Sequence, residues 1–118
     1  IASMNNEEAE CAFLLDHNPN IKYWVRNLER NPQHAFWLPT ATDKFYPDFA
    51  AQLHNGKILV VEYKGQHLDG SDAKEKEMIG KVWAEKSDNI FLMARAKDQL
   101  GNSLESQINN CLSTNKIF

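Results

Sequence analysis

The stretch "FYPDFAAQLHNGKILVVEYKG", residues 45–65, decides the fold. It contains two segments, residues 46–53 and 57–64, whose apolar side chains are dense enough for strands. Asn55 and Gly56 stand between them, and an Asn-Gly pair in that position is the strongest short hairpin signal in a sequence. The stretch therefore predicts an antiparallel β-hairpin.

Charged side chains interrupt the second strand of this hairpin. Successive side chains of a strand point to opposite faces, so Val60, Glu62 and Lys64 share one face. The hairpin also brings Asp48, at the first strand, into range of Glu62. Two carboxylates and an ammonium group at the end of a sheet are costly to bury. They therefore indicate a site that uses a cation or a substrate.

Hydrophobic periodicity and turn residues predict the elements outside the hairpin. Helical and extended patterns alternate along the chain, which is typical of an α/β protein. We expect a central mixed sheet of about four to five strands flanked by helices. Beyond the hairpin, the expected elements are helices at residues 5–17, 72–87 and 100–112, and strands within residues 21–30 and at residues 35–38 and 89–96.

The helix expected at residues 72–87 combines an apolar stripe with several lysines. Its large apolar side chains recur at intervals of three and four residues, which predicts that they face the sheet. Its lysines are best explained as a solvated face with pairing between neighbouring helical turns. The apolar stripe consists of Met78, Ile79, Val82 and Trp83.

The composition limits the class of protein. With 118 residues the chain fits one domain, which we place at residues 5–118, and residues 1–4 are a possible cloning remnant. No apolar run approaches the roughly 20 residues that cross a bilayer. The two cysteines form no CxxC pair, so we expect a reducing, cytoplasmic location. A net charge of −3 argues against a free-standing nucleic-acid binder unless basic side chains gather on one face.

The charged residues of the hairpin suit a particular chemistry. Carboxylate oxygens from Asp48 and Glu62, joined by a backbone carbonyl such as that of Tyr63, are ligands for a hard ion such as Mg²⁺, for which Mn²⁺ can substitute. Such an ion polarises a phosphoryl oxygen, and Lys64 could orient the attacking water or offset charge in the transition state. The pattern therefore predicts metal-assisted hydrolysis of a phosphodiester.

"YPDF" at residues 46–49, followed by "EYK" at residues 62–64, resembles the PD-(D/E)xK nuclease superfamily. The resemblance implies that the metal-binding Asp and Glu of that superfamily fall on Asp48 and Glu62, and its catalytic Lys on Lys64. It also implies a restriction-endonuclease-like core with the element order αβββαβ.

The wider setting resembles the C-terminal nuclease domain of type III restriction enzyme subunits. The segments that carry this resemblance are "EAECAFLLD", "WVRN", "VVEYKG" and "DAKEKEMIGKVW". It implies a DNA substrate, a prokaryotic cytoplasm, a helicase-like motor in the same polypeptide and a methyltransferase or specificity subunit as partner. The chain has no GxxxxGK[ST] loop, so ATP is expected to act only through that absent motor.

Residues outside the hairpin complete the predicted site. The superfamily often adds a glutamate from the first helix near the metal, and Glu8 is the best match, with Glu7 and Glu10 as competitors. Three side chains are candidate DNA contacts. They are Lys74, Lys76 and Arg26, the last of which could equally pair with an acid.

Other functions fit the same residues. Asp48 could simply end a turn, and Glu62 with Lys64 could be an ion pair on a solvated face. The alternative function is a non-catalytic DNA-binding or assembly module with a nuclease-like fold. A stand-alone repair nuclease or RNA nuclease is a third possibility that would use the same site residues.

Overall fold

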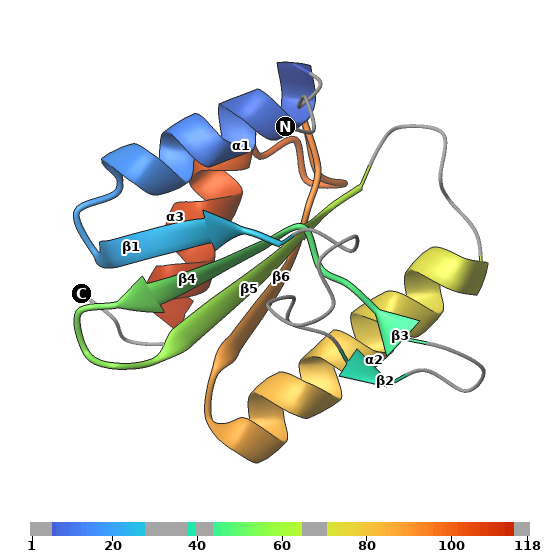
Figure 1. The fold of residues 1–118 in the computed structure, drawn as a ribbon. Coiled ribbons are helices and arrows are strands. Elements are labelled where there is room, and N and C mark those ends of the chain that lie inside the picture. The colour runs from blue at the N-terminus through green and yellow to red at the C-terminus, as the bar shows by residue number, and fades with distance from the viewer. Residues whose placement is uncertain (1–5, 28–37, 40–43, 65–70, 115–118) are drawn as a thin grey trace.

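The computed structural model describes residues 6–27, 38–39, 44–64 and 71–114 (Figure 1). These residues form an α/β fold with helices on both faces of a mixed sheet. None of the described helices has the length and apolar character needed to cross a membrane. In chain order the elements are α1 (Asn6–His17), β1 (Ile21–Arg26), β2 (Leu38–Pro39), β3 (Lys44–Phe45), β4 (Phe49–Leu53), β5 (Ile58–Tyr63), α2 (Ser71–Ser87), β6 (Ile90–Ala94) and α3 (Leu104–Thr114).

The main sheet has the strand order β1-β4-β5-β6. The hairpin of β4 and β5 is antiparallel, as predicted, and Gly56 takes the positive φ of 91° that its turn requires. β1 pairs antiparallel with β4, whereas α2 carries the chain across the sheet so that β6 runs parallel to β5. The predicted α/β fold with a mixed sheet is confirmed, and it is compatible with a restriction-endonuclease-like core.

The hydrophobic core lies between the sheet and the pair of helices α1 and α3. These two helices cover one face of the sheet, and α2 covers the other (Figure 1). Alternation along each strand sorts the side chains between the two layers. The core cluster contains Cys11, Ala12 and Leu15 from α1, Phe49, Ala51 and Leu53 from β4, Leu59 and Val61 from β5, and Leu104, Ile108 and Leu112 from α3.

The orientation of α2 differs from the predicted one. Met78 and Val82 were expected to face the sheet, but they are 67% and 46% exposed. Gly80 is instead the buried residue among positions 73–87 of this helix, and an added Cβ there would lie 2.5 Å from the ring of Phe91 on β6. The helix is therefore rotated toward its smallest residue, because only a glycine lets its backbone come so close to Phe91.

Gly80→Ala is expected to destabilise the protein by about 1–2 kcal/mol, although alanine is the better helix former by about 1 kcal/mol. The added methyl group must displace either the Phe91 ring or α2 itself. Urea unfolding of the two proteins measures the difference. Lys81→Ala on the exposed face of α2 is the control and should change stability by less than about 0.5 kcal/mol. A stabilised Gly80→Ala variant would contradict this packing.

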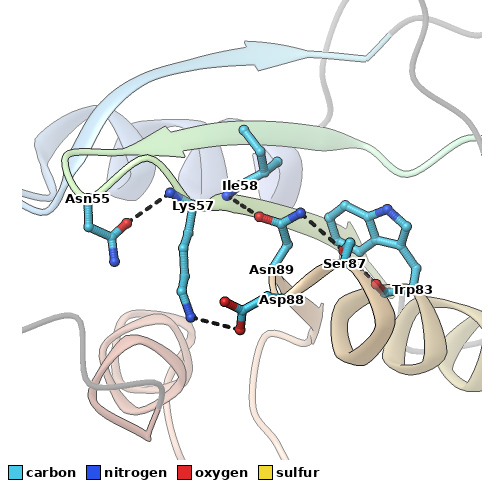
Figure 2. Close-up of polar contacts among 7 residues, drawn as sticks. All are labelled: Asn55, Lys57, Ile58, Trp83, Ser87, Asp88 and Asn89. Carbon is cyan, nitrogen blue, oxygen red and sulfur yellow. Dashed lines mark hydrogen bonds and ion pairs between the residues drawn. The ribbon is translucent and has the colours of Figure 1, made fainter.

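The C-terminal end of α2 is joined to the start of β5 by side-chain hydrogen bonds (Figure 2). Asn89 Oδ1 accepts the backbone N–H of Ile58 at 2.9 Å, and its Nδ2 donates to Ser87 Oγ at 3.1 Å. Lys57 Nζ lies 3.3 Å from Asp88 Oδ1. These contacts set the position of the helix relative to the strand that carries Glu62.

Two predicted elements have different boundaries in the structure. Of the strand expected at residues 35–38, only Leu38 lies in the described residues, where it pairs with Phe45 in a separate small sheet. The strand expected from residue 46 begins at Phe49, because Pro47 has no N–H to donate to a ladder.

The last helix begins at Leu104, four residues later than the predicted start at residue 100. Asp98 Oδ1 accepts the backbone N–H groups of Leu100 and Asn102, and Gly101 has a φ of 84°. This turn is incompatible with a helix. Ser103 then caps α3, because its Oγ accepts the backbone N–H of Ser106 at 3.2 Å.

Candidate functional site

The candidate site lies where β5 ends and β4 begins. The hairpin pairs Phe49 with Val61, so the same register places Asp48 opposite Glu62. Asp48 Oδ2 accepts the backbone N–H of Tyr63 at 2.8 Å, which fixes its carboxyl group beside the last residue of β5. The structure thus brings the two predicted carboxylates together; their chemical roles stay predictions.

Asp48 and Glu62, hereafter the carboxyl pair, lie within hydrogen-bonding reach of each other. Burial, followed by the negative charge of Asp48, raises the pKa of Glu62 from 4.5 to about 8. Burial also raises the pKa of Asp48, although the N–H of Tyr63 opposes that shift. The pair therefore retains a proton near neutral pH unless a cation compensates its charge.

Glu62 also has an unsatisfied oxygen. Its Oε1 is shut off from solvent and has no hydrogen-bond partner among the described residues. A buried acceptor left without a partner costs roughly 1–3 kcal/mol, more when it is charged. A ligand cation would satisfy this oxygen.

Lys64 directly follows β5 and is only 8% exposed. Its backbone N–H donates to the carbonyl of Ala94 at 2.8 Å, which continues the pairing with β6. Alternation continued one residue past Tyr63 would place its side chain on the face of Glu62. Lysine side chains are rarely buried this deeply unless they are paired with another group.

The backbone carbonyl of Tyr63 lies on the β4 side of β5. The peptide between Tyr63 and Lys64 is trans, so its C=O and its N–H point in opposite directions. The N–H of Lys64 points to β6, and the carbonyl oxygen therefore lies on the β4 side, where Asp48 is. The sequence-based expectation that this carbonyl supplements the two carboxylates is compatible with the structure.

These donors fit Mg²⁺ or Mn²⁺. Mg²⁺ needs few protein oxygens because it keeps several of its waters. Two carboxylates, one with an unsatisfied oxygen, and a backbone carbonyl supply such a set. The described residues contain no group of three or more His, Cys, Asp and Glu side chains placed to hold a metal. Within that part of the chain, a third carboxylate is thus not in position as a direct ligand.

Among the acids of α1, Glu8 is the one whose charge affects the pKa of Asp48. Its charge contributes to the raised pKa of Asp48, a contribution that is not found for Glu7 or Glu10. Glu8 Oε2 lies 3.7 Å from Arg26 Nη2, with both side chains about one-fifth exposed. Arg26, a predicted DNA contact, thus takes the alternative anticipated for it and pairs with an acid. A role for Glu8 in the site stays a prediction.

The other two predicted DNA contacts occupy different surroundings. Lys74 is exposed, beside Met78 on the outer face of α2. Lys76 points inward instead, with its Nζ 3.7 Å from Glu62 Oε2 and 5.4 Å from the centre of the Phe45 ring. The prediction of a solvated lysine face is therefore wrong for Lys76, because the rotation of α2 carries it to the carboxyl pair.

Sequence reasoning missed Asn27. Its backbone N–H donates to the carbonyl of Asp48 at 2.8 Å, and its Nδ2 donates to the carbonyl of Pro47 at 2.8 Å. The side chain and backbone of one residue thus hold the two peptides that orient Asp48. The only sequence signal is an asparagine immediately after the strand in "WVRN".

No protein-family model, no curated protein and no solved structure matches this chain. The resemblance to PD-(D/E)xK nucleases therefore rests on the motif and on the geometry described above.

Proposed function

We propose that the chain is a divalent-cation-dependent nuclease domain that hydrolyses DNA phosphodiesters. The observation that carries the proposal is the convergence of Asp48 and Glu62 at the end of β5, with one buried Glu62 oxygen lacking a partner. Structural carboxylates are normally satisfied by hydrogen bonds or ion pairs. An arrangement that leaves one incompletely satisfied supports a ligand-binding role.

Each residue of the site has a role in this proposal. Asp48 and Glu62, with the carbonyl of Tyr63, hold Mg²⁺ or Mn²⁺, and Asn27 and the N–H of Tyr63 keep Asp48 in place. When bound there, the ion would polarise the scissile phosphate. Lys64 orients the attacking water and offsets negative charge in the transition state.

Within this proposal the chain is the cleavage module of a type III restriction-like enzyme. A helicase-like motor in the same polypeptide would use ATP, and a methyltransferase or specificity subunit would select the DNA site. Exposed lysines such as Lys74 would add contacts to phosphates. The motif "YPDF…EYK" and the order of the elements support this assignment.

A cleavage assay on duplex and single-stranded DNA, with Mg²⁺ or Mn²⁺, tests the proposal. Glu62→Gln and Lys64→Ala should each lower the cleavage rate by at least about 100-fold, because the first removes a ligand of the ion and the second removes the group that orients the attacking water. Lys81→Ala, on the exposed face of α2, should cut like the wild type. The assay uses the chain alone and the complete polypeptide, since other domains supply affinity for DNA.

Two results would defeat the proposal. One is equal cleavage by the wild type and Lys64→Ala, which would identify a contaminating nuclease. The other is no cleavage by the complete polypeptide, with DNA binding that Mg²⁺ and Glu62→Gln leave unchanged. That second result would identify a non-catalytic DNA-binding module.

A further inference from the structure

Lys76 is built into the candidate site from the opposite layer of the fold. Its Nζ lies 3.7 Å from Glu62 Oε2, and the two side chains are only 32% and 13% exposed. An ion pair in such partly desolvated surroundings is stronger than one on an open surface. Burial raises the pKa of both carboxyl groups, and the positive charge of Lys76 opposes that rise at Glu62 and at Asp48.

Packing of α2 sets the position of this ammonium group. Gly80, one helical turn beyond Lys76, brings the helix against Phe91. The Phe91 ring meets the Phe45 ring edge to face at 6.3 Å, and Lys76 Nζ lies 5.4 Å from the centre of the Phe45 ring. At the far end of α2, the Asn89 network joins the helix to β5 (Figure 2). The position of Lys76 therefore depends on the packing of Gly80 and Phe45 around it and on the attachment of the far end of α2 to β5.

We propose that Lys76 is the internal counter-ion of the carboxyl pair: it holds Glu62 in the cation-free protein and, by competing with a divalent cation, sets the affinity of the site. The identity of the competing ligand rests on the proposed function. A cation at Glu62 and the ammonium group repel each other, so the long side chain of Lys76 moves toward solvent when the cation binds. Lys76 is thus a positioning residue that tunes the site.

Binding of Mn²⁺ to the chain, measured from the electron paramagnetic resonance signal of the free ion, tests the competition. Lys76→Met should bind Mn²⁺ roughly tenfold more tightly than the wild type, because one positive charge beside the ligand is removed. Lys76→Arg keeps the charge and should stay within about twofold of the wild type. Lys81→Met removes a lysine that pairs with Glu77 on the outer face and should also stay within about twofold.

A double-mutant cycle in EDTA tests the counter-ion role without any metal. Lys76→Met should lower the unfolding temperature of the wild type by several degrees and that of Glu62→Gln much less, because the partner charge is gone there. Equal losses in both backgrounds would overturn the counter-ion role.

The two measurements separate the possible failures. Equal Mn²⁺ affinity of Lys76→Met and the wild type would overturn the role of Lys76 and leave the carboxyl pair as a cation site. No Mn²⁺ binding by the wild type, with coupling present in the cycle, would overturn the proposed function and the competition while the counter-ion role stands.

Discussion

Glu62→Gln should make the cation-free protein more stable than the wild type at about pH 9, by about 2–4 kcal/mol. Burial raises the pKa of Glu62 from 4.5 to about 8, so the native state holds a proton that the unfolded chain has released between these pH values. The stability contributed by this group is complete below about pH 4.5 and is lost as the pH rises to about 8. Glutamine cannot ionise, and its amide can donate to Asp48 at every pH.

Urea unfolding in EDTA at about pH 5 and about pH 9 measures this effect. The wild type should lose stability between the two conditions, and Glu62→Gln should lose much less. Glu85→Gln removes an exposed carboxylate from α2 and should follow the wild type. Parallel losses for the wild type and Glu62→Gln would show that the Glu62 carboxyl is not buried against Asp48.

Phe49→Ala should destabilise the protein by about 3–5 kcal/mol. The Phe49 side chain is fully buried in the core, and its ring contacts the ring of Trp24 edge to face at 5.8 Å. Its loss leaves a cavity in the core between the sheet and the helices α1 and α3. Since small domains are stable by only about 5–15 kcal/mol, this substitution removes a large share of the total.

The control for Phe49→Ala is Phe13→Ala on α1. Phe13 is 59% exposed and stacks on His17, so its removal should cost less than about 1 kcal/mol. Both variants are compared by urea unfolding at one pH. Similar losses for the two phenylalanines would contradict the placement of the core between the sheet and the helices α1 and α3.

The hairpin and its two carboxylates could be predicted from sequence because they depend on neighbouring residues. Asn55 and Gly56 set the turn, the turn sets the register, and the register places Asp48 opposite Glu62. Alternation along β5 then assigns Lys64 to the face of Glu62. None of these steps requires knowledge of how distant elements pack.

The contribution of Lys76 could not be predicted from sequence because it depends on the rotation of a helix. The large apolar residues of α2 suggested that Met78 and Val82 face the sheet, but contact between Gly80 and Phe91 decides the orientation. Hydrophobic periodicity records where apolar side chains recur. This helix instead packs against the sheet at Gly80, which has no side chain. Lys76 reaches the carboxyl pair as a consequence.

The start of α3 is a second place where hydrophobic periodicity gave the wrong prediction. Leu100 has the spacing of a helical residue, yet it is 88% exposed in the turn that Asp98 organises. The hydrogen bonds of one aspartate outweigh the periodic pattern there. The pair of Glu8 and Arg26 is a long-range contact between α1 and β1, and sequence alone could only leave it as one of two alternatives.

Thermal unfolding with increasing Mg²⁺ tests most directly whether Asp48 and Glu62 form one cation site. A ligand held only by the native state raises the unfolding temperature, and the stabilisation grows as the logarithm of one plus the ratio of free ligand to Kd. The wild type should gain stability steadily through the millimolar range, and Asp48→Asn and Glu62→Gln should gain little. An unfolding temperature that does not change with Mg²⁺, or that rises equally in all three proteins, would contradict a cation site formed by Asp48 and Glu62.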